Sequence, residues 1–463
     1  MTRQISTRLS GGALALFVLL ALHSPASAEW KEKVLYSFQG VPDGATPAGG
    51  VVFGKDGNLY GATTDGGANF CAPTQCGTVF QLAPPAEQGD PWTETVIHIF
   101  QGDTNGDGNT PAGGVIFDQA GNLYGTTAYG GSGNCPLGGK VGCGTVYQME
   151  PPSTKGGSWT EKILYSFKGG KDGQLPQGDL VFDGAGNLYG ATEYGGGYGS
   201  CNWPFYRHCG TVFELSPPQA KDGRWTEKVL YSFKGVAAGK LSGDGANPNG
   251  GLVLDAKGAI YGTTYFGGNN VKGECKGGVG GTGCGIVFAL QPPTKKGGAW
   301  TEKMLHQFNG HDGSNSAAGV IFDENGNLYG TTFFGPGPYG LVFELKKPSG
   351  KVNSWTETIL YSFTDADDGA NPDAAVVRDT RGRLYGTALG GRTHLGVVFR
   401  LNLPMQAPSP MLTTLYNFAG SPDGDHPTAS LVFDRLGNLY GTTIWGGTGQ
   451  ACQGCGTIFE VEP

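Results

Sequence analysis

The residues best suited to chemistry in this chain lie in glycine-rich segments rather than in long apolar runs. Residues 201–209, with the sequence CNWPFYRHC, place four such side chains between two cysteines: Trp203, Tyr206, Arg207 and His208. Flat aromatic faces stack against sugar rings and other apolar surfaces, whereas arginine and histidine supply hydrogen-bond donors and a titratable ring. The combination predicts a ligand-binding loop, although a histidine in such a loop is more often a solvated side chain than a base.

Other aromatic residues occupy a position before glycine that recurs along the chain. This position holds Asp65, Tyr129, Tyr194, Phe266, Phe334, Leu389 and Trp445. Four of these residues are candidate ligand-binding residues: Tyr129, Tyr194, Phe266 and Trp445. Stacking on a sugar is the functional interpretation, and packing of one loop against another is the alternative. Arg392 and His394 lie in the segment of another repeat that matches residues 201–209, and they are candidates for the same reason.

One oxygen-rich segment resembles the first half of a calcium-binding loop. Asp103, Asn105 and Asp107 alternate with small residues as the first ligands of such a loop do. Its twelfth position is Gly114 instead of the glutamate that usually completes the site. We treat these three residues as a hypothetical site for Ca²⁺, which is the one cofactor that the sequence indicates.

Asp107 also belongs to an Asp-Gly pair that recurs seven times. The aspartates are Asp43, Asp107, Asp172, Asp244, Asp312, Asp368 and Asp423. Aspartate followed by glycine is a turn former, because the carboxylate accepts backbone N–H groups and glycine adopts positive φ. We favour this structural interpretation. The alternative is a ring of carboxylates that binds cations or acts as acid and base.

The elements that must position these residues are short strands in a repeated unit. A Leu/Ile-Tyr-Gly triplet recurs with its tyrosine at Tyr60, Tyr124, Tyr189, Tyr261, Tyr329, Tyr385 and Tyr440. Each unit has four strand-like pieces, as in residues 114–118, 122–127, 144–149 and 159–167. β-Branched and aromatic residues dominate these pieces, and Gly, Pro, Asn and Asp bound them. Four strands per unit are typical of a propeller blade.

The composition and the two ends of the chain agree with this interpretation. The 463 residues include 85 glycines and 28 prolines, which leave little room for long helices. Residues 30–38 form a fourth strand only, and residues 431–461 form the first three strands only. We therefore predict one all-β domain over residues 29–463. It is a seven-bladed β-propeller of four strands per blade, closed by pairing of the N-terminal strand with the C-terminal three strands.

Two kinds of connection should share one side of this disc. The segments between strands two and three carry the aromatic and glycine elements, and the segments between strand four and the next strand one carry the Asp-Gly pairs. The connections on the opposite side are a tight hairpin and a Pro-Pro spacer. Because loops on a rigid scaffold commonly carry function, we expect the binding surface on the loop-rich side, around the central funnel.

Ten cysteines fall into five local pairs. They are Cys71 with Cys76, Cys135 with Cys143, Cys201 with Cys209, Cys275 with Cys284, and Cys452 with Cys455. The second cysteine of each pair precedes the glycine that opens strand three, and two repeats lack both cysteines. This pattern predicts local disulfides formed in an oxidising compartment. A redox or metal role for Cys452 and Cys455 is the alternative, which the four sister pairs disfavour.

Residues 1–28 resemble a secretory signal peptide. Arg3 and Arg8 precede an apolar run, and Ala26-Ser27-Ala28 supplies a cleavage site. We expect a secreted or periplasmic monomer with no transmembrane segment, because no apolar run is long enough to cross a bilayer. The formal net charge is −8 and no basic run is present, which argues against nucleic acid and anionic membranes as partners.

The repeated pattern resembles the GloVer tandem-repeat family of exported bacterial proteins. One copy of its elements stands at residues 121–127, 130–131, 144–147, 164–167 and 172–173. The resemblance covers residues 29–463 and is specific as a repeat. It implies an exported repeat protein, but it implies no established activity and no catalytic residue.

Two functions fit these observations. The first is an exported propeller that binds a glycan or a protein ligand through its loop-rich face. The alternative is a propeller hydrolase or lyase that acts on a polysaccharide, with Asp103 or Asp107 acting together with His208 or Arg207. The chain contains no G-x-S-x-G and no H-E-x-x-H motif, so catalytic groups would have to come together from several blades. The sequence leaves open whether the protein is an enzyme.

Overall fold

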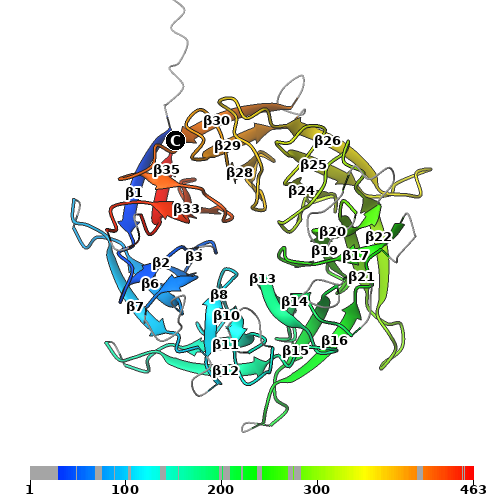
Figure 1. The fold of residues 1–463 in the computed structure, drawn as a ribbon, viewed down its shortest axis with the longest axis horizontal. Coiled ribbons are helices and arrows are strands. Elements are labelled where there is room, and N and C mark those ends of the chain that lie inside the picture. The colour runs from blue at the N-terminus through cyan, green and yellow to red at the C-terminus, as the bar shows by residue number, and fades with distance from the viewer. Residues whose placement is uncertain are drawn as a thin grey trace, which may run out of the picture.

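The fold is an all-β ring of seven sheets, seen in a computed structural model (Figure 1). The structure describes residues 30–47, 49–67, 76–87, 89–102, 106–135, 142–154, 156–197, 201, 209–220, 223–236, 242–269, 275, 283–403, 410–450, 452 and 454–463. No α-helix occurs in these ranges. The predicted seven-bladed β-propeller is therefore confirmed.

Blades 1 to 6 each take four strands from one stretch of chain, paired antiparallel from the inside of the ring outward. Blade 1 contains β3 (Val52–Phe53), β4 (Leu59–Thr63), β6 (Thr78–Ala83) and β7 (Thr93–Ile99). Blade 2 contains β9 (Ile116–Phe117), β10 (Leu123–Gly130), β11 (Thr145–Glu150) and β12 (Thr160–Ser166), with β8 (Gly108–Pro111) added beside β10. Blade 3 contains β13 (Gln174–Phe182), β14 (Leu188–Tyr194), β15 (Thr211–Ser216) and β16 (Thr226–Ser232).

The remaining blades repeat this arrangement. Blade 4 contains β18 (Val253–Leu254), β19 (Ile260–Thr264), β21 (Ile286–Gln291) and β22 (Thr301–Gln307). Blade 5 contains β23 (Ile321–Phe322), β24 (Leu328–Thr332), β25 (Leu341–Lys346) and β26 (Thr356–Ser362). Blade 6 contains β27 (Val377–Arg378), β28 (Leu384–Ala388), β29 (Val397–Asn402) and β30 (Met411–Asn417).

Blade 7 joins the two ends of the described chain. Its strands β32 (Val432–Phe433), β33 (Leu439–Thr443) and β35 (Thr457–Glu462) come last in the sequence, and its outer strand β1 (Lys31–Ser37) comes first. Strand β1 pairs antiparallel with β35, from Lys31 opposite Glu462 to Ser37 opposite Thr457. The predicted closure is thus confirmed, and β35 has no open edge.

The second strand of each blade is buried on both faces because neighbouring sheets pack against it. In β4 all five residues from Leu59 to Thr63 are buried. Only glycine fits at the third position of the Leu-Tyr-Gly triplet, because an aromatic ring of the neighbouring strand lies close to its Cα. A Cβ on Gly61 would lie 2.5 Å from the ring of Phe80. The triplet tyrosine in turn donates its hydroxyl to an aspartate in the hairpin before it, as Tyr124 does to Asp118 at 3.0 Å.

Aromatic pairs hold adjacent blades together around the ring. The phenylalanine after each outer strand meets the ring of strand three in the next blade edge to face. The centroid distances are 5.0 to 5.3 Å for Phe38–Phe80, Phe100–Tyr147, Phe167–Phe213, Phe233–Phe288, Phe308–Phe343, Phe363–Phe399 and Phe418–Phe459. The repeated tryptophans pack across the same boundaries, as Trp159 of blade 2 does on Tyr60 of blade 1. These contacts make the ring a single packed scaffold.

Candidate functional site

The two glycine-rich connections of each blade lie on one side of the ring and pair with each other. We call this side the loop face. Short ladders join β2 (Gly44–Ala45) to β5 (Asp65–Gly66), β17 (Ser242–Ala246) to β20 (Phe266–Asn269) and β31 (Gly424–Asp425) to β34 (Trp445–Gly446). In the first ladder Gly66 has φ of 86°, and a Cβ there would lie 2.6 Å from the backbone of Gly44. Glycine is therefore required where the two segments cross.

A second set of backbone contacts links neighbouring blades on this face. A residue with positive φ donates its N–H to the carbonyl just before strand three of the preceding blade. The pairs are Thr46 to Cys455, Thr110 to Cys76, Leu175 to Cys143, Asn247 to Cys209, Asn315 to Cys284, Asn371 to Tyr339 and His426 to Leu395. The second cysteine of each predicted pair thus sits at a blade-to-blade junction.

Four of the five predicted disulfides are confirmed. They join Cys135 to Cys143, Cys201 to Cys209, Cys275 to Cys284, and Cys452 to Cys455. The fifth pair involves Cys71, which lies outside the described residues. Because each bridge ends at a carbonyl that bonds the next blade, the disulfides fix the loop face where blades meet.

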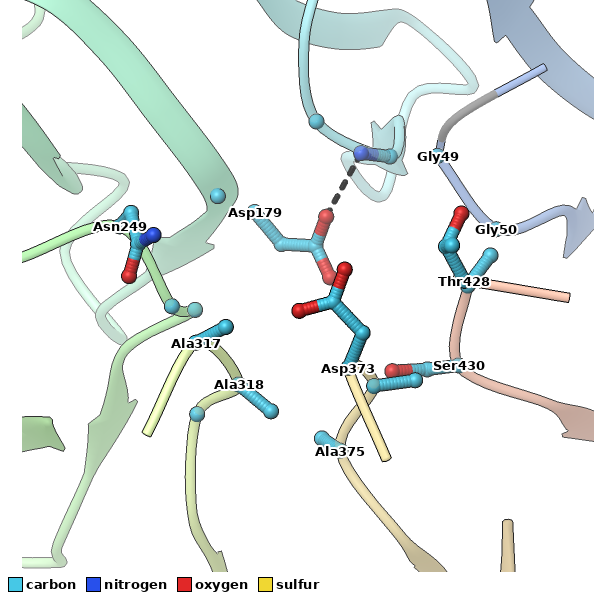
Figure 2. A pocket seen from close by; sticks show the side chains of 18 of the residues that line it. Gly49, Gly50, Asp179, Asn249, Ala317, Ala318, Asp373, Ala375, Thr428 and Ser430 are labelled. Carbon is cyan, nitrogen blue, oxygen red and sulfur yellow. Dashed lines mark hydrogen bonds between the residues drawn. The ribbon is translucent and has the colours of Figure 1, made fainter. Parts of the chain in front are cut away.

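A cavity of about 590 Å³ opens along the axis of the ring, and we call it the central channel. Its wall comes from the loop-face segments and from the first strands, which are rich in glycine and alanine. Asp179 of blade 3 and Asp373 of blade 6 point toward one another from opposite parts of this wall (Figure 2). Among the described residues that line the channel there is no lysine, arginine or histidine.

Both channel carboxylates hold protons more tightly than usual because the surrounding wall displaces water. The side chain of Asp179 is exposed to the channel and that of Asp373 is half-buried. Both nevertheless lie within the ring, where the surrounding protein leaves the carboxyl groups poorly hydrated. This desolvation raises the pKa of Asp373 to about 6 and raises the pKa of Asp179, even though the Gly114 N–H donates to Asp179 Oδ1 at 2.7 Å. Both carboxyl groups of the channel therefore take up a proton at higher pH than an exposed aspartate does.

A third acid lies beside the channel mouth. Glu193 accepts a hydrogen bond from Gln177 Nε2 at 2.6 Å, and burial raises its pKa. The pKa of Tyr265 is raised by burial first, and then by the charges of Asp373 and Glu193. Asp179, Asp373 and Glu193 thus make the loop-face end of the channel acidic.

An exposed tryptophan directly follows a residue that lines this channel. Trp445 is 48 % exposed, and its ring lies against that of His426 with centroids 4.6 Å apart. His426 Nδ1 contacts the carboxylate of Asp425. Ile444, the residue before Trp445, lines the channel. Trp445, His426 and Asp425 form an aromatic surface with polar groups beside it, which we call the Trp445 platform.

The structure places the other sequence-predicted residues unevenly. Tyr194 is buried, and Tyr129 and Phe266 are half-buried, so they contribute more to loop packing than Trp445 does. Arg392 and His394 are exposed in the blade 6 segment whose Leu395 carbonyl accepts the N–H of His426. Trp203, Tyr206, Arg207 and His208 lie outside the described residues.

The Asp-Gly aspartates bond within their own turns. Asp107 accepts the N–H of Gln101 at 2.7 Å and that of Gly108 at 2.6 Å. None of the seven is among the described residues that line the central channel. This geometry agrees with the turn-forming interpretation and does not form a carboxylate ring around the funnel. Asp103 and Asn105 of the hypothetical calcium site lie outside the described residues.

Comparison with known proteins places the repeat in a family. A model of the Gloeobacter/Verrucomicrobia repeat matches residues 24–274 and 275–463. The chain belongs to the Gloeobacter/Verrucomicrobia repeat family. No curated protein matches it.

Solved structures similar to this Gloeobacter/Verrucomicrobia repeat protein are β-propellers. A polysaccharide lyase of family PL25, an ulvan lyase, is 11 % identical, with 92 % of this chain and 95 % of that chain covered and a TM-score of 0.50. A Trypanosoma rangeli sialidase in complex with sialic acid is 12 % identical, with 82 % and 56 % covered and a TM-score of 0.40. A luciferin-regenerating enzyme is 15 % identical, with 75 % and 90 % covered and a TM-score of 0.41. At these identities the likeness concerns the fold.

The channel carboxylates of this Gloeobacter/Verrucomicrobia repeat protein depart from its own repeat. Asp179 stands where other blades have glycine, alanine or serine, and Asp373 stands where they have small or amide side chains. Aligning the seven segments before strand one would have singled out both residues.

The described residues include no helix that is long and apolar enough to cross a membrane.

Proposed function

We propose that this protein binds a carbohydrate at the loop-face mouth of its central channel. The observation that carries the proposal is the Trp445 platform. An exposed indole can stack on the apolar face of a sugar ring, while Asp425 and His426 lie beside it to bond hydroxyl groups. The channel beyond the rim has room for part of a ligand.

The acidic side chains in and beside the channel limit which sugars can bind there. Asp179, Asp373 and Glu193 lie in or beside it, and the described lining contains no cationic side chain. A uronate or sulfated chain would be repelled from this mouth, whereas neutral hydroxyl groups or a protonated amine can bond the carboxyl oxygens. We therefore propose a neutral or amino-sugar-containing glycan as the ligand class.

The binding test is a titration of glycans selected by array screening. We expect Trp445→Ala to weaken binding about tenfold or more, because stacking and buried apolar area are lost. Val352→Ala is a matched control, since Val352 is 51 % exposed and lies in the connection between β25 and β26 rather than on the loop face. Equal binding by wild type and Trp445→Ala, or selection of only acidic glycans, would contradict the proposal.

Hydrolysis of the bound glycan is the second candidate function, because Asp179 and Asp373 point toward one another in the channel (Figure 2). A pair of carboxyl groups, one protonated, is the usual equipment for glycoside cleavage. Reducing-end release should then be lost in both Asp179→Asn and Asp373→Asn while binding persists. If bound glycans remain intact over long incubation with wild type, the protein is a binding module only.

A further inference from the structure

One blade interface brings together three side chains that could ligate a metal. His98 lies on β7 of blade 1, Asp107 lies in the turn that leads to blade 2, and Glu161 lies on β12 of blade 2. His98 Nε2 is 3.7 Å from Asp107 Oδ1 and 3.7 Å from Glu161 Oε1. One ligand atom from each residue lies within 4.8 Å of the other two, and no other group of described residues meets this condition.

The other interfaces show what is unusual here. Five of them have a tyrosine at the His98 position, and its hydroxyl donates to the aspartate at 2.7 to 3.1 Å. The pairs are Tyr36–Asp43, Tyr165–Asp172, Tyr231–Asp244, Tyr361–Asp368 and Tyr416–Asp423. At these five interfaces the tyrosine hydroxyl gives the aspartate carboxylate a hydrogen-bond donor. An imidazole at 3.7 Å makes no such bond, so Nε2 of His98 is a buried atom without a hydrogen-bond partner. Oε1 of Glu161 is likewise unbonded, as it is in the equivalent glutamates of the other interfaces.

This donor set fits a tetrahedral transition metal. Zinc is held by imidazole nitrogen and carboxylate oxygen at about 2.0–2.1 Å, which places ligand atoms roughly 3.4 Å apart. The side chains of His98, Asp107 and Glu161 are only 19, 11 and 17 % exposed, so the three donors are largely shielded, and a water molecule bound with the ion would have to supply the fourth ligand. Calcium prefers six to eight oxygen ligands, and a nitrogen ligand disfavours it.

We propose that His98, Asp107 and Glu161 bind one Zn²⁺-like divalent metal ion between blades 1 and 2. The second histidine interface, His306 with Asp312 and Glu357, is the natural comparison within the chain. There His306 Nε2 is 3.3 Å from Asp312 Oδ2, but one ligand atom from each of the three residues cannot be chosen so that all lie within 4.8 Å of one another. The proposal therefore assigns the ion to the first interface.

The test is titration of tag-free, EDTA-treated protein with Zn²⁺ alone, followed by Co²⁺ to read the coordination from its visible spectrum. We expect one Zn²⁺ per chain, with affinity reduced about tenfold or more in His98→Tyr and Glu161→Gln. Tyrosine is the residue of the sister interfaces, so His98→Tyr should fold. Its metal-free thermal unfolding checks this.

Matched controls separate this interface from the rest of the ring. His306→Tyr and Glu227→Gln change the equivalent positions of other interfaces and should retain the Zn²⁺ affinity of wild type. Zn²⁺ binding that is as tight in His98→Tyr as in wild type would overturn the proposal, and so would binding of Ca²⁺ in place of Zn²⁺.

A second inference rests on a different feature, a cavity of about 710 Å³ at the hairpin side of blades 6 and 7. Half of the ten arginines of the chain line it: Arg378, Arg381, Arg383, Arg400 and Arg435. The sequence contains no basic run and predicted no basic cluster. The fold nevertheless makes one by placing a hairpin, a neighbouring strand and the next blade's hairpin together.

These arginines depart from the repeat. Arg378 stands where other blades have phenylalanine or leucine, Arg383 where they have asparagine or alanine, and Arg400 where they have glutamine, glutamate or alanine. Glu324 pairs with Arg378 at 2.6 Å and Asp379 pairs with Arg383 at 2.6 Å.

The remaining donors of this cavity point to a ligand. Arg400 and Arg435 have no carboxylate partner among the residues that the structure describes. The Nε atoms of Arg378 and Arg400 are buried and make no hydrogen bond. Planar guanidinium groups with spare donors bind oxyanions, often through two bonds at once. We infer that this cavity binds a ligand with several carboxylate, phosphate or sulfate groups.

The probes for this cavity are citrate, inorganic phosphate and a sulfated oligosaccharide, titrated separately to distinguish small anions from an acidic glycan. We expect at least one probe to bind, with affinity about tenfold weaker in Arg400→Gln and Arg383→Asn, which restore residues found in sister blades. Arg224→Gln changes an exposed arginine just before β16 of blade 3, outside both cavities, and should bind as wild type does. Unchanged affinity in Arg400→Gln and Arg383→Asn, or no binding of any probe to wild type, would overturn the inference.

Discussion

Six glutamates of the outer strands are buried between blades, each facing the aspartate of an Asp-Gly pair. Burial raises their pKa values to about 7 or 8 in Glu32, Glu94, Glu161, Glu227, Glu302 and Glu357. In each of them Oε1 makes no hydrogen bond. Leu412 occupies this position in the seventh interface. Because a leucine occupies this position between two packed blades, an ionised glutamate is not required for blades to pack.

Replacement of Glu94 by glutamine should make stability less dependent on pH. Burial, then the charge of Asp43, raises the Glu94 pKa from 4.5 to about 8, so the folded chain keeps a proton that the unfolded chain loses. Stability is therefore full below about pH 4.5 and falls as pH rises toward 8. Since solvent screens this half-buried group, we expect Glu94→Gln to be more stable than wild type at pH 8 by about 1–2 kcal/mol.

Chemical unfolding of both proteins at pH 5 and pH 8 measures this difference. The two should have nearly equal stability at pH 5 and should diverge at pH 8. Glu87→Gln is the control, because Glu87 is exposed and should leave the pH profile as it is in wild type. A Glu94→Gln profile parallel to that of wild type would show that Glu94 is ionised in the folded chain throughout this range.

Single residues were the least predictable part of the candidate site. Trp445 could be singled out because it breaks a recurring pattern that is visible in the sequence. Asp179 and Asp373 also break the pattern, but each is one small change in a Pro-x-Gly/Ala segment. Their meeting depends on the ring placing blades 3 and 6 across a common axis, and no local spacing contains that information.

At the scale of elements, each blade is tied to the preceding blade by one residue with positive φ. Three blades have asparagine there, and its side chain donates to a backbone carbonyl of the preceding blade, as Asn247 Nδ2 does to Glu193 at 3.1 Å. Thr46 adopts φ of 56° at the equivalent position. A β-branched residue is strained in this region, and asparagine tolerates it better.

Exchanging these residues should change stability in opposite directions. Thr46→Asn should stabilise the fold by about 1 kcal/mol, because it relieves the backbone strain and supplies a donor toward Ile444. Asn247→Thr should destabilise it by about 1–2 kcal/mol, because it adds strain and leaves the Glu193 carbonyl without this donor. Denaturant unfolding of both variants checks the signs. Two changes of the same sign would show that side-chain packing, not the φ constraint, decides these positions.

The four strands of each blade were predictable because their pattern recurs seven times between turn residues. The ladders of the loop face were not, since segments such as Gly44–Ala45 and Asp65–Gly66 have no strand-like composition. Their pairing follows from glycines that let two backbones cross closely.

At the scale of the whole molecule, the ring depends on the closing strand β1. Leu35 and Phe38 of this segment are buried in a core shared with Phe80 of blade 1, and Trp30 packs on Tyr385 of blade 6. Removal of residues 30–38 would expose the backbone edge of β35 and open both interfaces of blade 7. The sequence predicted this closure because a lone fourth strand begins the repeats and three strands end them.

A chain that begins at Gln39 should therefore lose several kcal/mol of stability, since burial of each large apolar side chain contributes about 1.5–3 kcal/mol. We expect its thermal unfolding to begin at lower temperature, and we expect it to self-associate through β35. A synthetic peptide of residues 30–38 should restore the wild-type transition by pairing with β35, whereas the same peptide with Leu35→Asp should not. An unchanged transition in the shortened chain without peptide would show that the ring holds by the packing of its blades alone.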